Sequence, residues 1–203
     1  MIISTIAAAS LALVGGLLSA PVLVDEHFNR VHPPSGKAPS TATLALHRNL
    51  WVADLHADSL LWQRDLNRDS QRGHVDFPRL QRANVALQAF SVVTKTPRKM
   101  NIERNGSDTD NITALVVAQG LPPATWNSLL ARATYQAGEL RQQASRSDGK
   151  VRVIGSRAQL RGFIAAREKD PALLAGWLTL EGAHALEGKL GNLDTLYRAG
   201  YRM

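Results

Sequence analysis

Residues 50–55 read LWVADL, a short apolar run of the kind that forms a buried β-strand. Two further runs have the same character, VALQAFSVV at residues 85–93 and LLAGWLTL at residues 173–180. A shorter strand is expected at residues 151–154, where the chain reads VRVI. The runs at 50–55, 85–93 and 173–180 are far apart in the sequence, so the segments between them decide how the strands pair.

The segments between these runs carry the signals of helices. Helix starts are marked by Asp76, Ser156 and Asn192, and helical stretches are expected at 111–119 and 125–146. The helix from Ser156 is expected to run towards Lys169, and the last one to end near Gly200. Strands that alternate with helices are typical of a parallel sheet covered by helices. We therefore expect either a doubly wound α/β sheet or a (β/α) barrel, with the polar residues 95–110 as a long functional loop.

The composition excludes several classes of protein. The 203 residues contain 24 Lys+Arg, 17 Asp+Glu and no cysteine. Without cysteine there is no disulfide framework, thiolate zinc site or cysteine nucleophile. The basic residues are spread along the chain without a basic block or a nucleic-acid motif, so no nucleic-acid partner is expected.

The N-terminus has a different character from the rest of the chain. Residues 2–24 contain no charged side chain, and as a helix they would extend about 35 Å, enough to cross the hydrocarbon core of a bilayer. Leu18-Ser19-Ala20 resembles a signal-peptidase site, but Pro21 would follow the cut, and we favour a retained anchor over a cleaved signal peptide. In either case residues 2–24 are expected to contact the membrane.

This division predicts three segments. Residues 1–24 are the signal anchor or signal peptide, residues 25–44 are a linker that includes Pro33-Pro34-Ser35-Gly36, and residues 45–203 are the folded body. The body is expected outside the cytoplasm, in the periplasm or the extracellular space. A homo-oligomer is compatible with the sequence.

Groups able to do chemistry follow two of the apolar runs. In parallel sheets such groups lie at the carboxyl ends of the strands. His56 and Asp58 form an H-x-D motif whose side chains point to the same side of an extended segment, where both could ligate one metal ion. The alternative is a core histidine beside a helix-capping aspartate. A second H-x-D, His74 and Asp76, lacks a preceding apolar strand, so we interpret it as a loop residue and a helix cap.

Four strings of sequence occur together in a recognisable order. They are DLHADSLLW (54–62), GHVDFPRL (73–80), NVALQAFSVVT (84–94) and LEGAHALEG followed by LGNLDTLYRAGYRM (180–203). In combination they resemble the membrane dipeptidase (renal dipeptidase) family of zinc metallopeptidases. The resemblance implies an amidohydrolase-like (β/α)8 TIM barrel that holds two zinc ions and hydrolyses dipeptides.

The resemblance also implies the metal ligands. The H-x-D of the family falls on His56 and Asp58, which would bind one Zn²⁺ ion, and its bridging glutamate falls on Glu181, which would hold both ions together. A hydroxide that bridges the two ions would attack the scissile carbonyl.

Three neighbouring residues each have two interpretations. Asp54 matches an acid of the family and either orients a ligand or bonds to nearby backbone. Trp62 is the candidate for a tryptophan that borders the substrate, with a simple hydrophobic wall as the alternative. His184 could join the site, although structural support of its loop is the favoured interpretation.

Other parts of the family's site are not matched in this sequence. Two histidines for the second zinc, a substrate-contacting histidine and the acid/base aspartate would all follow the position that matches Met203. A barrel also needs about 250 residues, whereas three core strands and the start of a fourth are predicted here. We therefore expect a truncated barrel that holds at most one Zn²⁺ and is inactive by itself.

Three hypotheses follow. The first is a fragment of a membrane-anchored, exported zinc dipeptidase, and the second is a non-catalytic membrane-anchored binding protein or one half of a split enzyme. The third is another metal-dependent amidohydrolase that acts on a different amide. The reading frame downstream of codon 203 would distinguish the first two.

Overall fold

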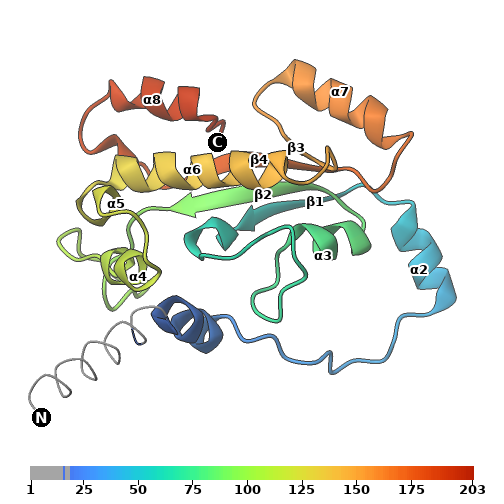
Figure 1. The fold of residues 1–203 in the computed structure, drawn as a ribbon, viewed down its shortest axis with the longest axis horizontal. Helices are drawn as coiled ribbons and strands as arrows, with labels where there is room; N and C mark the ends of the chain where they lie inside the picture. Colours follow the sequence, from blue (N-terminus) through green and yellow to red (C-terminus); the bar gives the residue numbers. More distant parts are fainter. Residues whose placement is uncertain (1–15, 17–18) are drawn as a thin grey trace, which may run out of the picture.

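A parallel sheet forms the centre of the molecule in a computed structural model that describes residue 16 and residues 19–203. The sheet has four strands in the order β1-β2-β4-β3 (Figure 1). The strands are β1 (Val52–Ala57), β2 (Val85–Val93), β3 (Val151–Val153) and β4 (Leu174–Glu181), and every pair is parallel. The expectation of an α/β fold with a parallel sheet is confirmed.

The C-terminal residues extend the sheet on the side of β4 that also carries β3. Tyr201 forms a parallel bridge with Leu178, and the Leu180 N–H donates to the Met203 carbonyl at 2.8 Å. The long strands β1, β2 and β4 therefore lie side by side in chain order, and residues 201–203 continue this order beyond β4.

The helices begin and end largely where their local signals predict. They are α2 (Thr41–Arg48), α3 (Phe77–Arg82), α4 (Ile112–Ala118), α5 (Ala124–Asn127), α6 (Leu129–Ser145), α7 (Arg157–Arg167) and α8 (Asn192–Ala199), with short 3-10 turns η1 (Ser59–Leu61) and η2 (His184–Leu186). Asp76 accepts a hydrogen bond from the Arg79 N–H at 2.9 Å, and Ser156 caps α7 through the Gln159 N–H. Helix α8 ends at Gly200, whose φ of +107° favours glycine.

Two local expectations are wrong. The helix expected at 125–146 is interrupted at Ser128, because this residue is extended and its side chain accepts from the Ala131 N–H to start α6 as a new helix. The first apolar run is not buried: β1 lies at the edge of the sheet, and Trp51, just before it, and Leu55, within it, are 54 % and 62 % exposed. The strand also extends to Ala57, so His56 lies within it.

The main core lies between one face of the sheet and helices α3, α6 and α8. Phe90 and Leu178 from the sheet pack there with Phe77 of α3, Leu140 of α6 and Leu196 of α8. Figure 1 shows α6 running alongside the strands. This layer holds the strands in place and so positions their carboxyl ends.

The N-terminal region packs against the body. Residues 19–28 are helical, Asp25 within this helix is buried, and residues 31–40 lead to α2 without a helix or strand. Most of the expected anchor at 1–24 lies outside the described residues. Among residue 16 and residues 19–203, no helix is long and apolar enough to span a bilayer.

Candidate metal centre

Three predicted ligands lie together at the carboxyl edge of the sheet. His56 is near the end of β1, Asp58 follows that strand, and Glu181 ends β4. The Nε2 atom of His56 is 3.4 Å from Asp58 Oδ1 and 3.2 Å from Glu181 Oε2. One ligand atom from each of the three side chains lies within 4.8 Å of the others. Strand direction explains the convergence, because parallel strands end at a common edge.

The surroundings of these side chains suit a metal ion. Asp58 Oδ1 is buried and receives no hydrogen bond from the described residues. A buried carboxylate oxygen without a donor is costly unless a cation completes its environment. One imidazole nitrogen and two carboxylate oxygens are ligands that Zn²⁺ accepts. The His56 and Glu181 side chains are about half exposed, which leaves the position accessible from solvent.

The orientation of His56 is set by the hydroxyl group of Ser91, which is itself bonded to a second hydroxyl group, that of Thr179. Ser91 Oγ of β2 lies 3.1 Å from His56 Nδ1 and 2.7 Å from Thr179 Oγ1 of β4. Both hydroxyl-bearing residues are 3 % exposed. A hydrogen bond at Nδ1 turns Nε2 towards the two carboxylates, which is the usual way that proteins orient a metal-binding histidine.

Sequence reasoning missed Ser91 and Thr179, although a signal was present. Each is a polar residue inside an otherwise apolar strand, and Thr179 has the period-two spacing that places it on the same side as Glu181. A polar side chain on the buried face of a strand needs a partner: here Ser91 contacts the histidine, and Thr179 contacts Ser91.

The remaining site predictions lie near the centre but outside the cluster of ligand atoms. Asp54 Oδ1 accepts from the His56 N–H at 3.2 Å, so it bonds to backbone beside the ligand. Trp62 lines the adjoining cavity, and His184 is exposed at the start of η2. The roles of all six residues remain predictions.

A cavity of about 340 Å³ opens beside His56 and Asp58. It is also lined by Trp62 and Arg64 from the segment after β1, by His74, and by Asn29 from the N-terminal region. The His74 side chain is thus near the centre without joining the cluster, while Asp76 serves as the cap of α3. No sequence pattern indicated that Asn29 or Arg64 would lie here.

The long loop after β2 is held by one buried cation. Arg132 of α6 is 1 % exposed, and it donates to the carbonyl groups of Thr94, Thr125 and Trp126 and to Asp110 Oδ2. Partial burial tends to raise the pKa of Asp110, but hydrogen bonds from Arg132 and other donors outweigh it and lower that pKa. Arg132 therefore joins the end of β2 to helices α5 and α6.

Fold and site together define a class. The chain is an α/β protein in which imidazole and carboxylate groups gather at the ends of parallel strands. The family model of the membrane dipeptidases (peptidase family M19) matches residues 41–203, and the chain belongs to this family. The resemblance found in the sequence is thereby confirmed.

Curated proteins and solved structures provide two further comparisons. The search of curated proteins finds no match. Among solved structures, the fold is similar to that of a metallopeptidase from Rhodobacter sphaeroides liganded with a phosphinate mimic of the dipeptide L-Ala-D-Ala, with 22% identity and a TM-score of 0.52. The match covers 75% of this chain and 44% of the neighbour, so the chain spans less than half of that protein.

Proposed function

We propose that this chain is the N-terminal part of a zinc-dependent dipeptidase whose complete domain is an amidohydrolase-like (β/α)8 barrel. The observation that carries the proposal is the convergence of His56, Asp58 and Glu181 at the carboxyl edge of a parallel sheet. Membership of the membrane dipeptidase family supports the reaction, and the dipeptide mimic bound by the neighbouring structure supports the substrate class.

His56 and Asp58 would hold one ion, and Glu181 would contribute its carboxylate to the same ion and to a second one. A bound Zn²⁺ ion supplies a Lewis acid that polarises a carbonyl group and lowers the pKa of water. Ser91 holds the imidazole by its Nδ1 atom, and Asp54 restrains the backbone of His56. These contacts place the ligand atoms before the metal arrives, which reduces the entropy lost on binding.

The cavity beside the ligands offers a place for a small peptide. Trp62 provides an apolar surface, Arg64 provides a positively charged guanidinium group, and His74 provides an imidazole. A volume of about 340 Å³ lies at the small end of the range found for ligand pockets. We therefore assign this cavity to one part of the dipeptide, with the scissile bond towards His56 and Asp58.

The test is a titration of the chain with Zn²⁺ by calorimetry. We expect one ion to bind, and we expect His56→Ala and Glu181→Ala each to weaken binding at least about tenfold, because each removes one of three donors. His74→Ala is the matched control, since it removes an imidazole that lines the same cavity outside the cluster. Equal affinity in all four proteins would contradict the proposed centre.

The activity itself needs a separate measurement. A longer natural form of the protein is expected to release amino acids from dipeptides, to lose this activity with a chelator and to regain it with Zn²⁺. Retention of full activity in His56→Ala or Glu181→Ala would refute the assignment of the ligands.

A second candidate is a membrane-associated binding protein or one half of a split enzyme. The position of β1 at the edge of the sheet favours it, because an edge strand readily pairs with another chain, and the exposed Leu55 of β1 and the preceding Trp51 offer apolar surface beside that edge. Co-expression with the segment encoded downstream, followed by a test for a stable complex, distinguishes this candidate from a single continuous enzyme.

We also propose that the uncharged segment of residues 2–24 attaches the protein to a membrane through the part that precedes Pro21, whose carbonyl is bonded to Gln119 of the body, and that the body lies outside the cytoplasm. The uncharged character of this segment supports the proposal. Fractionation of cells that express the chain, with a variant lacking residues 2–24 as control, tests it.

A further inference from the structure

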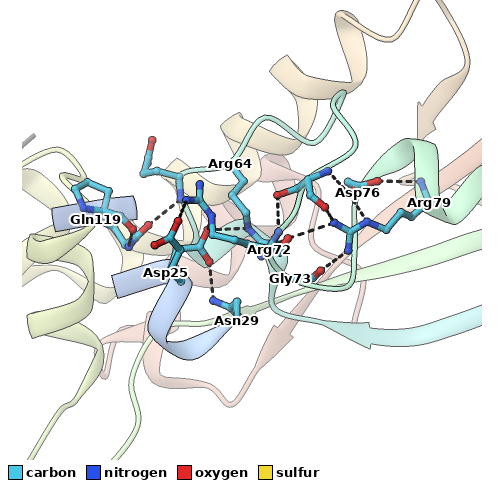
Figure 2. Close-up of polar contacts among 12 residues, drawn as sticks. Asp25, Asn29, Arg64, Arg72, Gly73, Asp76, Arg79 and Gln119 are labelled. Carbon is cyan, nitrogen blue, oxygen red and sulfur yellow. Dashed lines mark hydrogen bonds and ion pairs between the residues drawn. The ribbon is translucent and has the colours of Figure 1, made fainter. Parts of the chain in front are cut away.

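A buried carboxylate joins the N-terminal region to the segment that follows β1. Asp25 is 2 % exposed, and its Oδ2 atom lies 3.1 Å from Arg72 Nε and 3.6 Å from Arg64 Nε (Figure 2). Its Oδ1 atom accepts a hydrogen bond from the Asn29 side chain at 2.7 Å. The Arg64 side chain is 6 % exposed, so removal of Asp25 would leave a buried guanidinium group without its ion-pair partner.

Further hydrogen bonds fix both ends of this N-terminal region. The Pro21 carbonyl accepts from Gln119 Nε2 at 3.0 Å, and Gln119 Oε1 accepts from the Gln63 N–H at 3.0 Å. At the other end, the Gly73 N–H donates to the Asn29 carbonyl at 2.7 Å. The N-terminal region is thus bonded to the body at Pro21, through Gln119, and at Asn29, through Gly73.

The contact between Arg64 and Gly73 depends on the absence of a side chain. Gly73 has a φ of +67°, and a Cβ atom on it would lie 1.6 Å from Arg64 Nη1. The same Nη1 atom donates to the Arg72 carbonyl at 2.9 Å, and Arg79 donates to the Gly73 carbonyl. Figure 2 shows how these arginines enclose the turn at Gly73.

This network adjoins the candidate metal centre. Asn29, Trp62, Arg64 and Gly73 line the cavity that also contains His56. The ring of Phe28 lies 6.2 Å from that of Trp62, centre to centre. Within the N-terminal region, Asn29 therefore contributes to the lining of the cavity, and Phe28 packs behind Trp62.

We propose that residues 21–30 pack against the body so that Asn29 forms part of the wall of the candidate substrate cavity, and that Asp25 is a positioning residue that holds Arg72 and Arg64 in place, the latter beside the metal ligands. The role in a substrate cavity rests on the proposed dipeptidase function. The packing of residues 21–30 against the body does not, because the ion pairs and hydrogen bonds alone support it.

The test compares Asp25→Ala with Glu26→Ala in the full chain. Glu26 is the matched control, because it is the next residue, it is acidic, and its exposed side chain also faces Arg72, at 3.3 Å. We expect trypsin to cut Asp25→Ala after Arg30, Arg64 or Arg72 about tenfold faster than the wild type, since local opening exposes these bonds. We expect Glu26→Ala to be cut at the wild-type rate, because exposed ion pairs contribute little.

A second variant covers the case in which Asp25→Ala does not fold. Phe28 is 67 % exposed, so Phe28→Ala removes its contact with Trp62 and leaves the buried ion pairs intact. We expect faster cleavage after Arg30 in this variant as well. Wild-type cleavage rates in every variant that folds would overturn the proposal, whatever reaction the protein catalyses.

The readout for substrate is separate. In a longer form that hydrolyses dipeptides, Asn29→Ala and Asp25→Ala are expected to raise KM about tenfold, with Zn²⁺ affinity unchanged, because Asn29 lines the cavity and Asp25 accepts a hydrogen bond from its side chain. An unchanged KM together with faster proteolysis would refute the role in the cavity wall, while the packing of residues 21–30 against the body would still be supported. Absence of any dipeptidase activity would refute the proposed function instead. The tryptic cleavage rates would still test whether Asp25 holds residues 21–30 against the body.

Discussion

His56 Nε2 lies 3.2 Å from Glu181 Oε2, although β1 and β4 do not pair with each other. Strand β2 separates them, and strands two apart in a sheet are about 9.6 Å from one another. The imidazole and the carboxylate therefore meet by reaching across the end of β2. Ser91 of β2 contacts the same imidazole, so all three long strands contribute to one centre.

The carboxylate of Asp58 is expected to weaken the metal-free protein and to strengthen metal binding. Asp58 and Glu181 offer oxygen atoms within 4.8 Å of each other, and like charges at this distance repel. Asp58→Asn should raise the free energy of unfolding without metal by roughly 0.5–1 kcal/mol and lower Zn²⁺ affinity at least about tenfold. Thermal unfolding and calorimetry measure the two effects. Glu103→Gln, in the exposed loop, should change neither.

The hydroxyl of Ser91 should matter for metal affinity more than for stability. Ser91→Ala removes the partner of His56 Nδ1, and loss of such a partner typically weakens metal binding about 10–100-fold. Thr179→Val leaves Ser91 in contact with the imidazole, so a smaller effect is expected. Calorimetric titration with Zn²⁺ is the measurement. Wild-type affinity in Ser91→Ala would show that the ring is oriented by other groups.

Arg132 is expected to be essential for stability. Arg132→Met leaves the carbonyl oxygens of Thr94, Thr125 and Trp126 without this donor and Asp110 without its ion-pair partner, and breaking a buried network of this kind costs about 3–5 kcal/mol. Arg141 is the control on the same helix, because it is exposed, and Arg141→Met should cost about 0.5 kcal/mol or less. Urea denaturation measures both. Similar losses in the two variants would contradict the assigned role of Arg132.

The pair of Arg132 and Asp110 should also make stability depend on pH. The pKa of Asp110 is lower in the folded protein than its ordinary value of 3.8, so the ionised form stabilises the fold. This contribution is present above about pH 4 and is lost as the pH falls through the lower folded-state pKa. The stability difference between wild type and Asp110→Asn should therefore shrink in acid. A difference that stays constant from pH 7 to pH 3 would exclude this linkage.

Elements with strong local signals could be predicted from the sequence. Strand β2 was expected at residues 85–93 and has those bounds, and the caps at Asp76 and Ser156 start helices as expected. These signals act between residues a few positions apart, so no knowledge of the fold is needed. The exposure of β1 has the opposite cause, because it depends on which elements cover the strand. At Ser128 a local cap combines with a distant contact, because Glu187 accepts from the Ser128 hydroxyl and from the Leu130 N–H.

The sequence by itself determined which donors lie at strand ends. The H-x-D at His56 and Asp58, the acid at Glu181 and the family resemblance were all readable from the printed chain. Only the tertiary structure decided that these donors share one small space, that Ser91 orients the histidine, and that residues 21–30 pack beside them. The reason is physical. Contacts across a sheet follow from strand order and helix packing, which sum many weak interactions over the whole chain, and no short pattern encodes them.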